Sequence, residues 1–342
     1  MIARQCVLLD AFQVGVREVN LPDPAPNQIL IETEVSAISA GTELAVYTGT
    51  HQWLKDPNLP DWKFPFRPGY SAAGTIVAVG SDINGWKAGD RVCFPGNHAS
   101  HEMLTMGHER GRLWQMPDNL TFDKAALGCI SRYGLGSPVR AGLTLGRSAA
   151  VLGLGIIGQF SLRCLIAAGA WPVVGIDAVP MRRDAAMKAG ADAVIDPGAG
   201  SIPEQLQAFL KARGAEVVID ATGVPDAIPV AMSLACDAGQ VIVVGSPRGK
   251  ANNVNFYDDL HRRYIDVCGA HGNMLFEPAH TRLAGAWDIN KAQNWLLAAL
   301  ASGRLSLAGL VTHVITPDKL GDAYEGLMKD KDNYLGVLVM WK

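Results

Sequence analysis

The chain has 342 residues, enough for two domains of ordinary size. It carries 30 lysines and arginines against 33 aspartates and glutamates, and the net charge of -3 excludes the broad basic field that attracts nucleic acid or anionic lipid. No apolar stretch reaches membrane-spanning length, no secretory signal is visible, and the six cysteines stand singly. We therefore expect a cytoplasmic protein with reduced thiols that binds neither nucleic acid nor membranes.

Roughly the first 130 residues alternate short β-type runs with turn residues. The clearest runs are 29–35, 74–79 and 89–92, and together they predict a β-rich domain. One loop stands out, because residues 47–67 place several aromatic side chains among prolines. Either this loop contributes to a substrate pocket or its aromatic residues pack against one another.

From about Ser148 the pattern changes to short apolar strands separated by helical stretches. The expected strands are 150–152, 172–176, 193–195, 216–219, 240–244 and 266–268. Six strands with interleaved helices predict a doubly wound parallel sheet. A helix at 290–301 and strands at 310–315 and 335–340 follow, and we expect this tail to rejoin the first domain. The predicted domains are 1–130 with 286–342, and 131–285.

A glycine-rich turn follows the first of these strands and opens a helix. Gly153, Gly155 and Gly158 have the G-x-G-x-x-G spacing, in which the glycines permit a tight turn, close approach of a pyrophosphate, and close packing of helix on strand. The amides of Ile156 and Ile157 would face the phosphates at the helix N-terminus.

Asp177 ends the next strand, where a carboxylate binds the ribose hydroxyls and repels a 2'-phosphate. This position favours NAD over NADP, although Arg182 and Arg183 stand nearby. A glycine-rich turn that binds nothing is the alternative interpretation.

Several further motifs accompany this turn, namely Pro68-Gly69-Tyr70, the 89–92 turn, Asp220-Ala221-Thr222-Gly223 and Val244-Gly245. Together they resemble the medium-chain dehydrogenase/reductase superfamily over nearly the whole chain. The resemblance implies a GroES-like β-rich catalytic domain and a Rossmann domain, with the nicotinamide in the cleft between them. It also implies cofactor contacts from Thr222, Gly245 and Ser246.

Many members of that superfamily hold a catalytic zinc through three protein ligands. Here Ala40 begins the segment that resembles the family's first ligand segment, and Tyr70 stands where the family has a histidine. Only Cys129 resembles a ligand, and the four-cysteine structural lobe is absent from the sequence. We therefore predict an enzyme without zinc.

Without a metal, other groups must stabilise the substrate oxyanion and handle its proton. Tyr70 either does this or packs as a core tyrosine in the space of a missing ion. Thr42 matches the hydroxyl residue that starts the family's proton relay, and Glu43 matches the carboxylate that orients the histidine ligand. Arg132 is either an oxyanion partner or a surface ion pair, and His271 is either an acid or base or a loop residue bonded to the backbone.

The candidate substrate contacts are His51, Trp53, Tyr133 and Asn273. Tyr133 and Arg132 fall on the segment that in the family crosses beneath the nicotinamide. His98 and His101 precede Glu102 in what reads as a solvated turn, so we leave both outside the site.

The main functional hypothesis is an NAD-dependent dehydrogenase that oxidises a secondary alcohol, such as a polyol, cyclitol or sugar hydroxyl. Residues 36–43 and 69–70 also resemble the bacteriochlorophyllide dehydrogenases. The alternatives are an enone or quinone reductase and a dinucleotide-binding protein without catalysis. Strand 240–244 resembles the element through which the family forms dimers, so we expect a homodimer or homotetramer.

Overall fold

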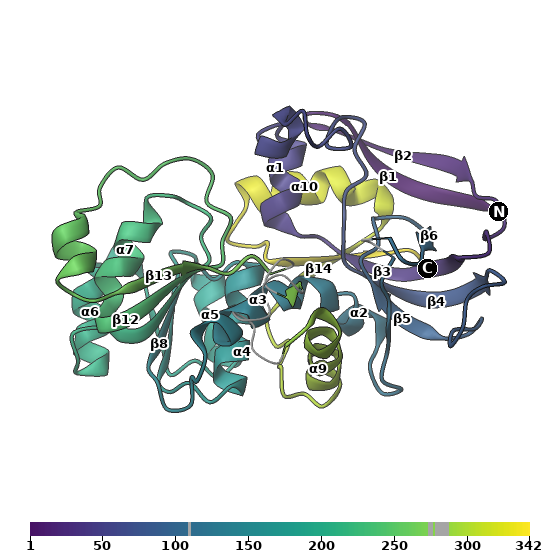
Figure 1. The fold of residues 1–342 in the computed structure, drawn as a ribbon. Helices are drawn as coiled ribbons and strands as arrows, with labels where there is room; N and C mark the ends of the chain where they lie inside the picture. The colour runs from purple at the N-terminus through teal and green to yellow at the C-terminus, as the bar shows by residue number, and fades with distance from the viewer. Residues whose placement is uncertain (109–110, 273–275, 278–286) are drawn as a thin grey trace. The chain divides into compact units, whose positions relative to one another are not determined.

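A computed structural model describes residues 1–108, 111–272, 276–277 and 287–342 (Figure 1). By its contacts the chain divides into two compact units. The first comprises Met1–Ile130, Gln293–Ala301 and Val311–Lys342, and the second comprises Ser131–Ala292 and Ser302–Leu310. No helix among the residues covered is both long and apolar enough to cross a membrane.

The first unit is built on a seven-stranded sheet of order β14-β15-β3-β4-β5-β7, with β6 pairing β3. Its strands are β3 (Gln28–Ala37), β4 (Ala72–Val79), β5 (Arg91–Phe94), β6 (His101–Thr105), β7 (Trp114–Gln115), β14 (Val311–Ile315) and β15 (Gly336–Met340). Ile31 lies opposite Ile76 in the β3–β4 register, and both pack into a buried cluster with Val92 and Phe94. Alternate residues of these strands thus supply one apolar face. A hairpin that the sequence did not reveal, β1 (Ile2–Asp10) and β2 (Gln13–Asn20), adds a two-stranded sheet.

Short helices accompany this sheet, and two of them pack together. The helices are α1 (Ala40–Tyr47), η1 (Gln52–Lys55), α2 (Phe122–Ala125), η6 (Pro317–Lys319) and α10 (Leu320–Lys329). Tyr47 of α1 and Tyr324 of α10 have ring centroids 5.1 Å apart within one buried cluster. Helices α1 and α10 are therefore joined by an aromatic contact between segments far apart in the sequence.

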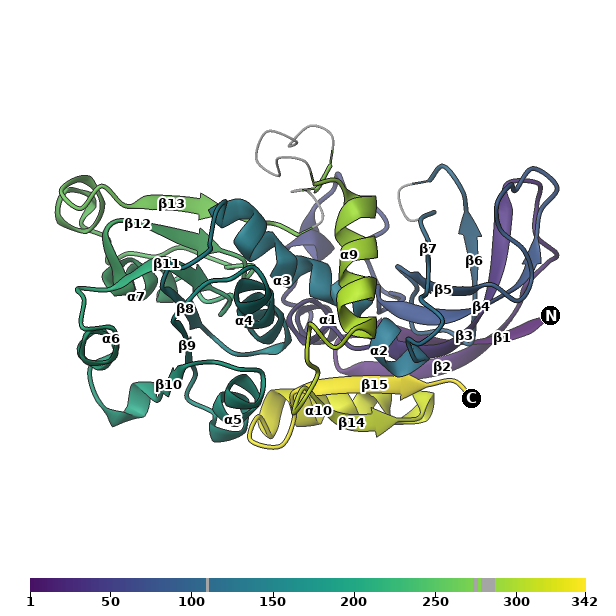
Figure 2. The same cartoon turned by 90° about the horizontal axis from the view of Figure 1, so that it is seen from below.

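The second unit holds a parallel sheet of order β10-β9-β8-β11-β12-β13, seen with its helices in Figure 2. The strands are β8 (Ala149–Leu152), β9 (Val173–Ile176), β10 (Ala193–Ile195), β11 (Ala215–Asp220), β12 (Ala235–Val243) and β13 (Asp266–Gly269). The helices are α3 (Gly128–Ala141), α4 (Ile156–Ala167), α5 (Pro180–Lys188), α6 (Ile202–Leu210) and α7 (Ala227–Leu234), with shorter turns η2 (Pro197–Ala199) and η3 (Phe256–His261). Most of α9 (Ile289–Ala301) belongs to the first unit. The unit boundary falls within α3 and α9.

The two faces of the parallel sheet are covered by different helices. Val151 and Ile219 share one buried cluster with residues of α3, α4 and α5, whereas Ala150 and Val218 share another with residues of α6 and α7. Adjacent residues of a strand thus point to opposite covered faces, which explains why β8 and the middle of β11 are apolar on both faces. This is the doubly wound sheet that the sequence predicts.

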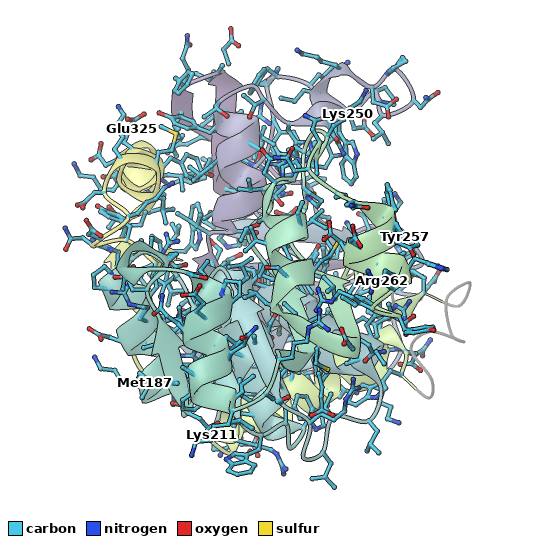
Figure 3. The ribbon with its side chains drawn as sticks, turned by 90° about the vertical axis from the view of Figure 1, so that its left-hand side faces the viewer. Met187, Lys211, Lys250, Tyr257, Arg262 and Glu325 are labelled. Atoms are coloured by element: carbon cyan, nitrogen blue, oxygen red, sulfur yellow. The ribbon has the colours of Figure 1, made fainter. Side chains whose placement is uncertain are left out.

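One sequence expectation needs correction. The sequence assigned all of 286–342 to the first domain, but the residues up to Ala292 and the segment Ser302–Leu310 group with the second unit. For Ser302–Leu310 the reason is the buried Arg163, whose guanidinium donates to the carbonyl oxygens of Ser306 at 2.6 Å and Ala308 at 3.0 Å. Strand β12, which contains the expected strand 240–244, lies next to the edge strand β13 of the parallel sheet. Beyond β12 in the chain, η3 carries Tyr257, whose exposed ring lies 5.9 Å from the Arg262 guanidinium (Figure 3).

Candidate active site

The turn after β8 has the shape that a dinucleotide phosphate site requires. Gly153 has a φ of +87°, and a Cβ there would lie 2.9 Å from the Thr222 methyl carbon. A Cβ on Gly158 would lie 1.8 Å from the carbonyl oxygen of Gly153. A Cβ on Gly155, by contrast, would point into open space, so this face of the turn is free for a ligand. The amides of Ile156 and Ile157 stand in the first turn of α4, where backbone N–H groups have no partner within the helix.

Asp177 follows β9 directly and is held by backbone donors. Its carboxylate accepts hydrogen bonds from the amides of Leu154 at 2.7 Å and Val179 at 2.8 Å, and Arg182 lies 3.7 Å away. The bond to Leu154 ties the carboxylate to the glycine-rich turn. The acidic side chain therefore stands beside the phosphate site, which fits a nucleotide with free ribose hydroxyls.

Thr222 and Gly245 lie at the carboxyl ends of β11 and β12, close to the turn. The Thr222 hydroxyl donates to the Asp220 carboxylate at 2.7 Å, and a Cβ on Gly245 would lie 2.5 Å from the Gly223 nitrogen. Burial raises the pKa of Asp220, while the two hydrogen bonds from Thr222 act in the opposite direction. Ser246 follows Gly245 at the exposed end of this loop. These residues with the glycine-rich turn and Asp177 have the donors that a nicotinamide dinucleotide requires.

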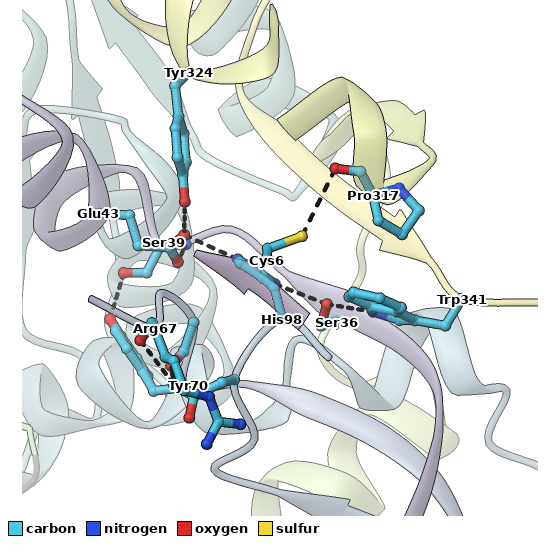
Figure 4. Close-up of polar contacts among 12 residues, drawn as sticks. Cys6, Ser36, Ser39, Glu43, Arg67, Tyr70, His98, Pro317, Tyr324 and Trp341 are labelled. Carbon is cyan, nitrogen blue, oxygen red and sulfur yellow. Dashed lines mark hydrogen bonds and ion pairs between the residues drawn. The ribbon is translucent and has the colours of Figure 1, made fainter. Parts of the chain in front are cut away.

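In the first unit, Glu43 is the centre of a buried polar network (Figure 4). One carboxylate oxygen accepts from the Ser39 amide at 2.7 Å; the other accepts from His98 Nε2 at 2.9 Å and from the Tyr324 hydroxyl at 2.6 Å. Burial acts to raise the pKa of Glu43, but its electrostatic interaction with His98 and these hydrogen bonds lower it overall. The carboxylate thus orients a histidine, although not the one expected from the family pattern.

His98 is the clearest omission of the sequence interpretation. We expected a solvated turn, but its side chain is 0% exposed and bonded at both ring nitrogens. Nδ1 lies 2.8 Å from the Ser36 hydroxyl, which in turn accepts from Trp341 Nε1 at 3.0 Å. The partners come from distant parts of the chain, so no local spacing signal could have revealed them.

Tyr70 is half-buried, and its hydroxyl forms a short hydrogen bond with the Ser39 hydroxyl (Figure 4). The segment before it is fixed by Asn97, whose side-chain amide donates to the carbonyl oxygens of Arg67 at 3.0 Å and Gly69 at 2.8 Å. Gly69 has a φ of +93°, and a Cβ there would lie 2.8 Å from the His98 nitrogen. The Tyr70 hydroxyl is therefore directed by specific contacts. Thr42 lies half-buried on α1, next to Glu43 in the chain.

The aromatic residues of the 47–67 loop pack together. His51 is buried, its Nδ1 accepts from the Trp53 amide at 3.3 Å, and its ring stacks on Trp62 with centroids 4.6 Å apart. Trp62 also contacts Trp53 edge-on at 4.6 Å. His51 and Trp53 thus belong to one aromatic cluster, in which each ring is supported by the others.

The remaining candidates lie in the second unit. Arg132 is buried, which excludes the surface ion pair considered for it. Tyr133 and His271 have ring centroids 6.1 Å apart, and a Cβ on Gly272 would lie 2.6 Å from the Tyr133 ring. Desolvation lowers the pKa of His271, although the ring is partly exposed. Asn273 lies outside the described residues.

The residues at the family's zinc positions do not fit that metal. Ala40 has no donor, the Tyr70 hydroxyl is paired with Ser39, and the Cys129 sulfur lies 3.8 Å from the buried Cys93 sulfur. Within the described ranges, no three side chains of His, Cys, Asp or Glu come together as a metal site. A catalytic zinc needs three such ligands, so these positions lack the donors that would hold it.

A doubly wound sheet with a dinucleotide turn, in a chain that also forms a β-rich unit, defines a nicotinamide-dependent oxidoreductase. Two family models match the chain: the alcohol dehydrogenase GroES-like domain over residues 25–136 and the zinc-binding dehydrogenase over residues 157–287. The chain belongs to the medium-chain dehydrogenase/reductase superfamily, as its motifs predicted.

Named relatives align along most of the chain. An L-threonine 3-dehydrogenase of Pyrococcus abyssi is 26% identical over 345 residues, covering 92% of each chain. A 2-desacetyl-2-hydroxyethyl bacteriochlorophyllide A dehydrogenase of Cereibacter sphaeroides is 27% identical over 354 residues, covering 98% of this chain and 97% of its own. The crystal structure of 2R,3R-butanediol dehydrogenase from Bacillus subtilis superposes with a TM-score of 0.83 at 22% identity, covering 99% of both chains. The predicted fold, a GroES-like domain with a Rossmann domain, is confirmed.

Proposed function

We propose that this protein is a zinc-independent, NAD-dependent dehydrogenase that oxidises a secondary alcohol to a ketone. The observation that carries the proposal is the Tyr70 hydroxyl, which is directed by Ser39 at the position where the family has a zinc-binding histidine. A phenol held in this way can exchange a proton with a substrate oxygen. In enzymes that have a catalytic metal, the metal instead promotes loss of this proton by binding the alkoxide.

In the proposed reaction, separate residues bind the cofactor and transfer the proton. Asp177 binds the ribose hydroxyls, and the α4 N-terminus binds the phosphates. Bound NAD supplies the acceptor for the hydride. Tyr70, as its phenolate, takes the proton of the alcohol as the C–H electron pair leaves as hydride, so a ketone and a neutral phenol form; the phenol then releases this proton to water before the next turnover. Thr42, Arg132 and His271 are the further polar groups that we assign to the substrate oxygen and its proton, and we assign Glu43 an indirect role through its hydrogen bond with Ser39.

The substrate class follows from polar chemistry and from the relatives' names. L-threonine carries a hydroxyl at the position named in its dehydrogenase, and the bacteriochlorophyllide relative is named for a hydroxyethyl group. We assign polyols, cyclitols or sugars to this chain, with His51, Trp53, Tyr133 and Asn273 as substrate contacts. Aromatic faces bind the C–H surfaces of sugars, which supports this choice.

We also propose a homodimer or homotetramer, joined through the edge of the parallel sheet. Among the described strands, β13 ends the sheet and Val267 on it is partly exposed. An unpaired strand edge is a template for pairing with a second copy. Light scattering at several protein concentrations tests this, and a monomer at all of them would contradict it.

The first experiment is an absorbance assay at 340 nm with NAD or NADP, a panel of polyols, cyclitols, sugars and aryl alcohols, and a chelator. NAD reduction that survives the chelator supports the proposal, and Tyr70→Phe should then lower turnover about 100-fold or more. Activity that the chelator abolishes, or turnover unchanged in Tyr70→Phe, would overturn it. NADPH oxidation by enones, with no alcohol activity, would assign the protein to the reductases instead.

A further inference from the structure

Two residues without a predicted role hold the network together: Ser39 joins Tyr70 to the buried carboxylate of Glu43, and His98 bonds the same carboxylate. Ser39 is 3% exposed and His98 is 0% exposed. Buried polar networks of this kind are retained only when each member is satisfied, and then they fix side-chain positions. The donors in this network therefore set the direction of its hydrogen bonds.

The donor order starts at Trp341, whose indole nitrogen can only donate. Because Ser36 Oγ accepts this bond at 3.0 Å, its own proton is free to point at His98 Nδ1, 2.8 Å away. His98 Nε2 carries the proton directed at Glu43 over 2.9 Å, because a carboxylate can only accept.

Every donor around Glu43 then points at its carboxylate. His98 Nε2 and the Tyr324 hydroxyl donate to one oxygen, and the Ser39 amide donates to the other at 2.7 Å. A carboxylate with three donors is satisfied as an anion and has little freedom to rotate. Its hold on the Ser39 amide fixes the backbone immediately before α1.

The Ser39 side chain extends the network to Tyr70, because its hydroxyl is hydrogen-bonded to the Tyr70 hydroxyl. A free phenol hydroxyl rotates about its C–O bond, so a fixed partner decides where its proton and lone pairs point. A misplacement of about 1 Å in a reacting group costs on the order of 100-fold in rate.

We propose that His98, Glu43 and Ser39 form a positioning unit that fixes the direction of the Tyr70 hydroxyl toward the substrate oxygen. This inference rests on the proposed function, since it gives Tyr70 the proton transfer. The three residues act through Tyr70 and touch neither substrate nor cofactor. The buried Glu43 carboxylate and the Ser39 hydroxyl thereby position the Tyr70 hydroxyl, which transfers the proton.

The test compares Ser39→Ala, His98→Ala and His98→Gln with Ser137→Ala as a matched control. Ser137 is an equally buried serine, with its hydroxyl 2.9 Å from that of Ser161, in the nucleotide-binding unit. We expect Ser39→Ala and His98→Ala to lower kcat about tenfold to 100-fold while KM and the Kd for NAD stay within about twofold. His98→Gln keeps an N–H toward Glu43 and should restore most of kcat. Ser137→Ala should leave kcat unchanged.

A second readout does not depend on turnover. The chain has seven tyrosines, and in protein labelled with ¹³C at tyrosine Cζ the Tyr70 signal is the one missing from Tyr70→Phe. This signal should shift in both Ser39→Ala and His98→Ala. In His98→Ala the Tyr324 signal should shift as well, because Tyr324 donates to the same Glu43 oxygen, while the other five stay in place. A wild type that oxidises no alcohol refutes the proposed function alone, because the Tyr70 signal still reports on the positioning unit.

The inference is overturned if the Tyr70 signal and kcat are unchanged in both Ser39→Ala and His98→Ala. It is also overturned if kcat, KM and the Kd for NAD all worsen together, since general loss of structure would then explain the effect. If His98→Ala does not fold, Ser39→Ala and His98→Gln still decide the question.

Discussion

Replacing Tyr324 by phenylalanine removes one of the three donors to the buried Glu43 carboxylate and leaves the ring in place. The Tyr324 hydroxyl lies 2.6 Å from the carboxylate oxygen, and neither residue is more than 2% exposed. A hydrogen bond to a charged group contributes about 1.5–3 kcal/mol, so we expect the free energy of unfolding to fall by about 2 kcal/mol. That loss lowers the ratio of folded to unfolded protein about 30-fold at neutral pH.

The matched control is Tyr47→Phe. Tyr47 also donates its hydroxyl to a carboxylate, Glu325 at 2.8 Å, and its ring contacts that of Tyr324. Because the Glu325 carboxylate is exposed to water, its lost partner is replaced by solvent, and the loss of stability should be clearly smaller. Urea unfolding followed by tryptophan fluorescence measures both variants. Equal losses in the two would refute the argument that burial of Glu43 sets the cost.

The pH dependence of the same variant has a definite sign. Folding lowers the pKa of Glu43, so its contribution to stability is complete above the unfolded value of about 4.3 and is lost as the pH falls through the lower folded value. Tyr324→Phe removes one of the bonds that lower this pKa. The stability gap between wild type and Tyr324→Phe should therefore be largest at neutral pH and shrink below about pH 4. A gap that widens in acid would contradict the assignment of Glu43 as a carboxylate.

Three further variants test the nucleotide-binding unit. Gly155→Ala places a Cβ in open space, so the melting temperature should stay near that of the wild type. NADH fluorescence titration should show at least about tenfold weaker binding, because the Cβ would stand where the phosphates approach the backbone. Equal affinity would show that no phosphate approaches this turn. Asp177→Asn removes the charge 3.7 Å from Arg182 and should shift the ratio of the Kd values for NADP and NAD at least about tenfold toward NADP, whereas an unchanged ratio would exclude Asp177 from ribose recognition. Arg163→Met leaves the Ser306 and Ala308 carbonyl oxygens without their donor and should cost about 3 kcal/mol or more in urea unfolding, and a loss below about 1 kcal/mol would show that water or a neighbour replaces it.

The sequence alone predicted the doubly wound sheet, because its strands are covered on both faces and read as short apolar runs between helices. It also located the glycine-rich turn and Asp177, since that signal is local: three glycines at fixed spacing, a strand before them and a helix after them. The sequence did not predict the β1–β2 hairpin, because at least half of the β2 side chains are exposed. This exposure weakens the alternation of apolar and polar residues by which a strand is recognised.

The network around Tyr70 was decided by tertiary structure. Glu43 was recognised from a local motif, but its partners His98 and Tyr324 lie 55 and 281 residues away in the chain. The sequence predicts a turn at His98, because the residues next to it in the chain do not indicate its contact with Ser36, which in turn is bonded to Trp341. Local spacing determines elements and turns, whereas the pairing of buried polar groups depends on which distant segments the packed sheet and helices bring together.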